Sequence, residues 1–232
     1  AGLFHSCNAS KLMLSLDFSK PEARPVIEDL VGWADIVCES FAPGKLESMG
    51  WGYQSLREMK PGLIMLSTSL MGQTGPLAKY AGYGNLAAAV SGFFELTGWD
   101  DRAPAGPFGA YTDYIVPKFC ASSLLAAVEH RRRTGEGQHI DVSQAEAALS
   151  FLAPALFDYA INGVTATRSG NRDLHFAPHG VYPCSGDDSW IAIGVETDVE
   201  WEALCGALNA DDLAGDARFA NTSRRRENAQ VL

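Results

Sequence analysis

One segment of the sequence brings a carboxylate to a position where it could act as a nucleophile. Residues 106–113 (GPFGAYTD) form a glycine-rich approach to Asp113, and the apolar pattern after it predicts a long helix that begins there. A carboxylate at a helix start can simply cap free N–H groups, which stabilises the helix by about 1 kcal/mol. A loop-to-helix junction can also hold a nucleophile rigidly and expose it to a pocket. Position alone favours the cap, and both interpretations stay open.

Motifs for other common chemistries are missing. No GxGxxG follows the first predicted strand and no GxxxxGK[ST] occurs, so neither a nicotinamide dehydrogenase nor a P-loop enzyme is supported. His130 and His139 are separated by a predicted turn, and His175 and His179 flank Pro178, which prevents a shared regular helix. We therefore expect no metal site.

The elements that must position Asp113 alternate between strand and helix over the first part of the chain. Strands are predicted at residues 12–17 (LMLSLD), 35–38 (DIVC) and 63–67 (LIMLS), with helical patterns between them. This alternation is typical of a parallel sheet with crossover helices. The sequence thus predicts an α/β fold with a Rossmann-like sheet.

In the rest of the chain, Asp113 begins a predicted helix that is followed by one more strand. The predictions are helices at 85–96, 113–132 and 144–161, strands at 138–142 and 190–195, and a helix capped by Asp198 that ends near residue 208. Ser143 and Glu146 form a predicted capping box at the start of the helix at 144–161. Turn residues multiply after Asn162, so we predict a large domain over 1–165, and a linker with the start of a smaller α+β domain over 166–232.

Composition indicates an ordinary soluble protein of 232 residues, with 47% hydrophobic and 20% charged residues. No apolar run reaches the roughly 20 residues of a membrane span, and the net charge of −10 disfavours a nucleic-acid partner. The five cysteines show no CxxC spacing, which favours a reducing cytoplasm. The start at Ala1 without Met and the end at Leu232 inside a helical pattern indicate a fragment cut at both ends.

Several strings, taken together, resemble the family III CoA-transferases, also called the CaiB/BaiF family of acyl-CoA transferases and racemases. They are NASKLMLSLD (8–17), ADIVCESFAPGKLESMGWGYQSL (34–56), PGLIMLSTSLMGQTGP (61–76), VSGFFELTG (90–98), RRRTGEGQHIDVSQAEA (131–147) and APHGVYPC (177–184). They occur in the order of the family across almost the whole chain, which makes the resemblance far more specific than any one string.

The resemblance implies that Asp113, the aspartate upstream of RRRTGEGQ, is the catalytic carboxylate. It would attack an acyl-CoA thioester to give an acyl-aspartyl anhydride, which the CoA thiolate converts to an aspartyl-CoA thioester. The acceptor, a small carboxylic acid, then leaves with CoA. The resemblance also implies an interlocked homodimer with the active site near the subunit interface.

The resemblance further implies that coenzyme A, bound as acyl-CoA, contacts the positions that match the nucleotide-side strings of the family: Asn8, Lys11, Phe41, Pro43, Gly44 and Tyr83. A lysine can reach a phosphate, an aromatic ring can lie against adenine or pantetheine, and a Pro-Gly turn allows close backbone approach. Each also has an ordinary structural explanation, as a solvated charge or a packed ring.

The chain departs from the family pattern at two positions, with Ser40 where the family usually has Asn and Pro117 where it often has Gly. The glycine-rich loop that covers the family's active site would lie beyond Leu232. Racemases of the family have a histidine where this chain has Tyr83, and a phenol is a poorer group than an imidazole for α-proton transfer at neutral pH, so a racemase is the second alternative. A third alternative is that the chain is the catalytically silent, CoA-binding half of a tandem fusion.

Overall fold

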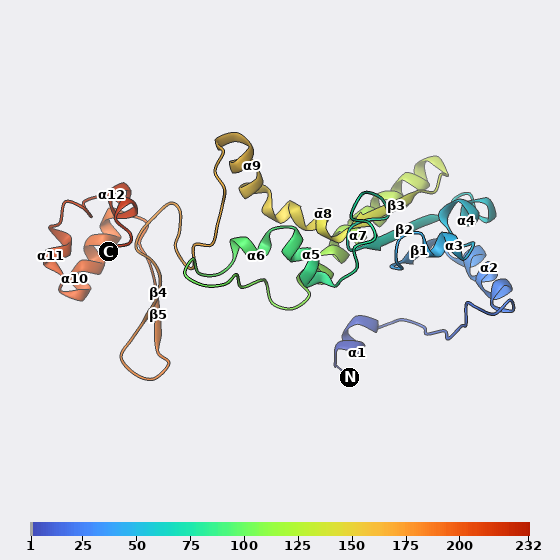
Figure 1. Cartoon of the computed structure of the whole chain (residues 1–232), viewed down its shortest axis with the longest axis horizontal. Helices are drawn as coiled ribbons and strands as arrows, with labels where there is room; N and C mark the ends of the chain where they lie inside the picture. Colours follow the sequence, from blue (N-terminus) through green and yellow to red (C-terminus); the bar gives the residue numbers. More distant parts are fainter. Residues whose placement is uncertain (1) are drawn as a thin grey trace. The chain divides into compact units, whose positions relative to one another are not determined.

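The computed structural model describes residues 2–232 and divides into two compact units (Figure 1). Of the described residues, the first comprises 2–87 and Ala110–Ser150, and the second comprises Ala88–Gly109 and Phe151–Leu232. Ala1, the first residue of the predicted large domain, lies outside the described residues. The predicted limits of the large domain (1–165) and of the linker with the smaller domain (166–232) remain a prediction.

The first unit is built on a parallel sheet of β1 (Ile36–Glu39), β2 (Ile64–Ser69) and β3 (His139–Ser143), in the order β1-β2-β3 (Figure 1). The central strand β2 is apolar at residues 64–66 and buried there, as expected for a strand covered on both faces. The register aligns Glu39 with Ser67 and Ser67 with Asp141. The predicted α/β class with a parallel sheet is confirmed.

Helices precede, connect and follow these strands, and some of them supply the core of the first unit. They are α1 (Gly2–Asn8), α2 (Ala23–Trp33), α3 (Lys45–Ser48), α4 (Tyr53–Met59), α5 (Gly84–Val90), α7 (Tyr111–Thr134) and α8 (Gln144–Leu149). The main core cluster consists of Val31, Leu46, Trp51, Leu56, Leu63 and Met65. Because these residues come from α2, α3, α4, β2 and the turns before α4 and β2, their burial fixes the crossover between β1 and β2.

Two predicted elements of the first part of the chain are wrong. Residues 12–17 are not a strand: they pair with no strand within residues 2–232, and Leu12, Met13 and Leu14 are exposed. The predicted helix at 85–96 is two helices, α5 and α6 (Phe93–Leu96), because Gly92 adopts a left-handed conformation between them with φ of 99°. Neither the unpaired state of residues 12–17 nor the break at Gly92 can be recognised from local alternation and apolar spacing in the sequence.

The predicted helix at 144–161 is likewise interrupted. It consists of α8, a 3₁₀ turn over Ser150–Leu152, and α9 (Ala153–Asn162). Pro154 has no N–H to donate, so it is accommodated in the first turn of α9 and not inside a longer helix. The predicted role of Ser143 is confirmed in part, since its hydroxyl accepts the N–H of Glu146 at 3.2 Å.

The second unit holds α6, α9, the antiparallel pair β4 (His179–Pro183) and β5 (Trp190–Gly194), and three C-terminal helices, α10 (Asp198–Leu208), α11 (Asp211–Ala214) and α12 (Thr222–Glu227). Its core contains Val195, Trp201, Cys205 and Phe219. Asp198 is not the cap of α10 as predicted, because Thr197 accepts the N–H of Glu200 in a full capping box. Asp198 instead pairs with Arg225 at 2.9 Å.

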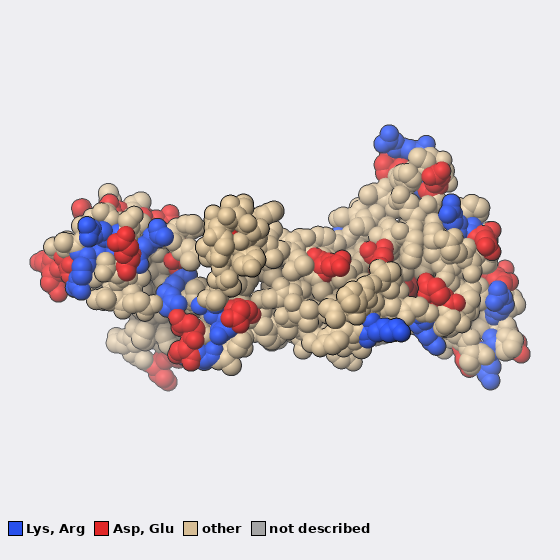
Figure 2. All heavy atoms as spheres, turned by 45° about the horizontal axis from the view of Figure 1, so that its top comes forward, with Lys and Arg blue, Asp and Glu red and all other residues tan. Residues whose placement is uncertain are grey.

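Charge is dispersed over the visible surface. Figure 2 shows acidic and basic side chains interspersed on the face that it presents, without one large basic area. Across residues 2–232, no helix combines the length and the apolar character that crossing a membrane requires.

Candidate active site

Asp113, the predicted start of the helix, is the third residue of α7, because the helix begins two residues earlier at Tyr111. Ala110 occupies the N-cap position and makes no side-chain cap. The Asp113 side chain accepts the backbone N–H of Gly84 at 3.3 Å, a residue from the start of α5. The carboxylate is therefore bound to another segment, in the first turn of a helix of 24 residues whose N-terminal end favours a negative charge.

Thr112 links α5 and α7 to α8 from the buried side. Its fully buried hydroxyl lies 3.1 Å from the carbonyl oxygen of Gly84 and 2.9 Å from Oε1 of Gln144, the first residue of α8, and its single proton is shared between these two acceptors. Sequence reasoning missed Thr112, Gly84 and Gln144 as parts of the site. The only signal was their proximity in sequence to Asp113, to Tyr83 and to the end of a strand.

Pro117 departs from the family pattern without breaking α7, which continues through it to Thr134. A proline at this position has no N–H to offer the carbonyl oxygen of Asp113, four residues earlier in the helix. One backbone acceptor next to the candidate nucleophile is thus left without its usual helical partner.

A second group of polar side chains holds the turns at the carboxyl ends of the strands. Glu39, the last residue of β1, accepts the backbone N–H of Phe41 at 2.7 Å, and Gln73 Nε2 donates to the other oxygen of Glu39 at 3.4 Å. The carboxylate of Asp141 on β3 accepts the backbone N–H of Gln73 at 2.9 and 3.1 Å. Polar groups from β1, β3 and the turn after β2 are therefore joined into one chain of hydrogen bonds.

This chain of hydrogen bonds positions the predicted CoA turn at residues 41–44. Gly44 adopts a left-handed conformation with φ of 77° as the N-cap of α3, and Lys45 donates its N–H to the carbonyl of Ala42 at 2.9 Å. Phe41 is 43% exposed, so its ring is available to a ligand.

We expect Gln73→Glu to raise the KM for acyl-CoA in the full-length protein about tenfold, because two carboxylates would then face each other and release the turn at Phe41. Adding Glu39→Gln restores the pair with the donor and acceptor exchanged, and should return KM to within about twofold of the wild type. Glu39→Gln alone should have little effect, since the Gln73 amide can rotate. Glu22→Gln, on the exposed start of α2, is the control. A double variant as impaired as Gln73→Glu would contradict the pairing.

The other predicted CoA residues occupy two separate segments of the first unit. Lys11 Nζ donates to the carbonyl of Cys7 at 2.8 Å and to Oδ1 of Asn8 at 3.2 Å, so Asn8 and Lys11 are joined to each other within the α1 segment. Tyr83 is 79% exposed and directly precedes Gly84, which places it next to Asp113. The hydrogen bonds thus bring Tyr83 to the candidate nucleophile and Phe41 to the strand ends.

Three cysteines are poor alternative nucleophiles. Partial desolvation raises the pKa of the exposed Cys38 thiol and the half-buried Cys120 thiol above the ordinary value, with the neighbouring Cys120 adding to the rise at Cys38, and burial raises the pKa of the Cys205 thiol. These three remain protonated at neutral pH, and a thiol is a much weaker nucleophile than a thiolate. Within residues 2–232, no three His, Cys, Asp or Glu side chains gather into a cluster that could hold a metal ion.

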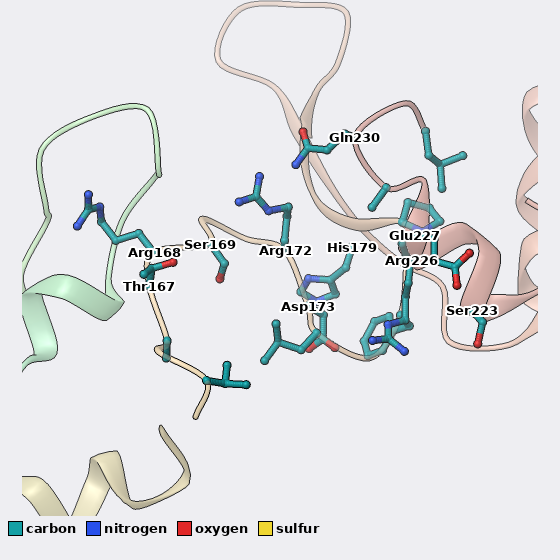
Figure 3. Close-up of a pocket in the computed structure, with 18 of the residues that line it drawn as sticks. Thr167, Arg168, Ser169, Arg172, Asp173, His179, Ser223, Arg226, Glu227 and Gln230 are labelled. Carbon is teal, nitrogen blue, oxygen red and sulfur yellow. The ribbon is translucent and has the colours of Figure 1, made fainter. Parts of the chain in front are cut away.

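The second unit contains a cavity of about 660 Å³, formed by the connection after α9 and by the C-terminal segment (Figure 3). Two of the arginines that line it are already paired, Arg168 with Glu95 at 2.8 Å and Arg172 with Asp100 at 2.7 Å. None of the residues predicted for catalysis or CoA binding lines this cavity. The candidate site is therefore the one around Asp113 in the first unit.

The fold and the site define an α/β protein with an exposed carboxylate, held by a backbone N–H, in the unit that carries the turns beyond the carboxyl ends of a parallel sheet. Ligands of open α/β sheets bind at that edge. A family model described as CoA-transferase family III matches residues 1–232. The chain belongs to this family.

Relatives of known name agree with the family. The chain is 35% identical to succinyl-CoA–D-citramalate CoA-transferase of Chloroflexus aurantiacus over 96% of its own length and 55% of the relative. It is 34% identical to acetyl-CoA:oxalate CoA-transferase of Acetobacter aceti, over 99% and 59%. A solved CaiB/BaiF family protein from Brucella suis matches with a TM-score of 0.89 and 34% identity, over 100% of this chain and 61% of that one. The chain thus spans little more than half the length of these curated relatives.

Proposed function

We propose that the full-length protein is a CoA-transferase that moves CoA from a donor thioester to an acceptor carboxylate through an aspartyl-CoA intermediate on Asp113. The observation that carries the proposal is the Asp113 carboxylate, exposed in the first turn of α7 and held by Gly84 through one oxygen, so that the other oxygen is free to attack. Membership of CoA-transferase family III supports the reaction type.

The proposed reaction proceeds in two symmetrical halves. Oδ1 of Asp113 attacks the thioester carbon, the C–S bond breaks, and CoA leaves as thiolate with the electron pair. The thiolate then attacks Cγ of Asp113 in the mixed anhydride, the Cγ–Oδ1 bond breaks, and the donor acid leaves as carboxylate. The acceptor carboxylate attacks Cγ of the aspartyl-CoA thioester and expels the thiolate, which finally attacks the acceptor's acyl carbon and restores the Asp113 carboxylate. No oxidant, water or metal ion is needed for this balance.

The remaining predicted residues have supporting roles in this proposal. Phe41, Pro43 and Gly44 would receive the nucleotide and pantetheine parts of CoA, with Lys11 and Asn8 on the phosphate side and Tyr83 beside the reacting carboxylate. The relatives are named for succinate, glutarate, citramalate and oxalate, which makes small dicarboxylic acids the first acceptor class to screen. An interlocked homodimer is part of the same proposal and predicts a dimeric mass in solution for the full-length protein.

Mass spectrometry of the full-length protein with a panel of acyl-CoA donors tests the function. We expect a hydroxamate after hydroxylamine treatment, or a CoA adduct, on the peptide that contains Asp113. Entry of solvent deuterium at the acyl α-carbon without any adduct would instead indicate the racemase. CoA binding with neither result would indicate the catalytically silent alternative.

A further inference from the structure

The backbone of Gly84 approaches Asp113 more closely than any other residue type allows. Its N–H lies 3.3 Å from Asp113 Oδ2. A Cβ on residue 84 would lie 2.7 Å from the backbone nitrogen of Asp113, 2.8 Å from the carbonyl oxygen of Ala110 and 2.9 Å from Asp113 Cγ. Two of these atoms are backbone atoms, which a side-chain rotation cannot move, so glycine is required for this contact.

The backbone of Gly84 is held at its carbonyl group as well as at its N–H. The fully buried Thr112 hydroxyl shares its proton between the Gly84 carbonyl oxygen at 3.1 Å and Oε1 of Gln144 at 2.9 Å. The N–H and the carbonyl of residue 84 are therefore both bound to the first turn of α7, one through Asp113 and the other through Thr112. A donor held in this way needs no reorganisation when charge develops near it.

We propose that the Gly84 N–H is the oxyanion donor for the two steps in which Asp113 Cγ is attacked; this inference rests on the proposed function. If Oδ1 forms the anhydride, Oδ2 is the carbonyl oxygen of the activated aspartate. Attack on Cγ by the CoA thiolate or by the acceptor carboxylate moves an electron pair onto Oδ2, the atom that Gly84 contacts. The hydrogen bond is longer than the usual 2.7–3.1 Å of an oxyanion donor, as is common without substrate, and tightens as charge grows on Oδ2.

Loss of the Gly84 N–H should affect the two steps of the first half-reaction differently. In the first step the negative charge develops on the acyl oxygen of the donor and not on Oδ2, the atom that Gly84 contacts, whereas in aspartyl-CoA formation it develops on Oδ2. Losing the donor should therefore slow the second step and cause the acyl-aspartyl anhydride to accumulate. A role limited to placing Asp113 would instead slow the first step, and no anhydride would accumulate.

The test compares Gly84→Ala with Gly84→Pro in the full-length protein. Both introduce the same Cβ, but only proline removes the N–H, and the first position of a helix accepts it. We expect the proline variant to form aspartyl-CoA about 100-fold more slowly than the alanine variant, and to give more hydroxylamine-trapped acyl-aspartate in rapid-quench samples. Equal rates of aspartyl-CoA formation in the two variants would overturn the proposal.

Thr112 provides a second test if the Gly84 variants fail to fold. Thr112→Val removes the donor to the Gly84 carbonyl at nearly constant volume, and Thr112→Ser retains it. We expect the valine variant to form aspartyl-CoA about tenfold more slowly, with accumulation of the anhydride, and the serine variant to resemble the wild type. A valine variant with unchanged kinetics would sink the proposal. A wild-type protein that forms no adduct at Asp113 would count against the proposed function itself.

Discussion

Replacing Asp113 with asparagine in the full-length protein should lower CoA-transferase turnover by about 10⁴-fold or more while leaving the fold intact. The amide keeps an oxygen that can accept the Gly84 N–H, so the contact between α5 and α7 survives. It has no carboxylate to attack a thioester, and loss of a covalent nucleophile costs several orders of magnitude. Steady-state transfer between an acyl-CoA and a dicarboxylic acid, with circular dichroism as the check of folding, measures both effects.

The matched control is Asp29→Asn, an exposed aspartate on α2, which should retain full activity. The asparagine variant separates catalysis from capping, because a carboxylate that only stabilised the start of α7 would lose about 1 kcal/mol of stability and little activity. An Asp113→Asn protein with at least a tenth of the wild-type turnover would therefore remove Asp113 from the proposed chemistry.

Much of the sheet follows from the sequence because β1 and β2 contain short apolar runs and β3 alternates polar and apolar residues. The strands predicted at 35–38, 63–67 and 138–142 coincide with β1, β2 and β3 to within a few residues. Residues 12–17 have a similar pattern but no neighbouring strand within residues 2–232, and a strand is defined by its partner. Local pattern thus predicts where a strand can form, and the rest of the chain decides whether it does.

The candidate site, like the sheet, can be predicted only in part from the sequence. Asp113 and the turn at Phe41 can be predicted, because an aspartate after a glycine-rich loop and a Pro-Gly turn are visible in the sequence. The contact of Gly84 with Asp113 joins residues far apart in the chain and depends on how α5 meets α7. The alignment of Glu39, Ser67 and Asp141 depends on the register of three strands. The sequence alone does not determine the register of paired strands or how closely two helices approach each other.

Arg225 is expected to be the most sensitive position of the second unit. Its side chain has no exposed surface, and its guanidinium donates to the carbonyl oxygens of Ala177, Phe219 and Thr197 and to the Thr222 hydroxyl, with an ion pair to Asp198 at 2.9 Å. These acceptors come from the segments that enclose the core around Trp201. Arg225 therefore satisfies several carbonyl groups that would otherwise be buried without a donor.

Arg225→Met should lower the stability of the second unit by about 3 kcal/mol, since methionine fills part of the volume but leaves those carbonyl groups unpaired. Arg226→Met, on the same helix but exposed, should change stability by less than about 0.5 kcal/mol. Hydrogen exchange of the α10 amides in the full-length protein measures the difference without requiring that both units unfold together. Equal protection of α10 in the two variants would show that its stability does not depend on the buried guanidinium. Arg225→Lys should fall between them, because a single ammonium group keeps the charge but cannot reach acceptors arranged around a planar fork.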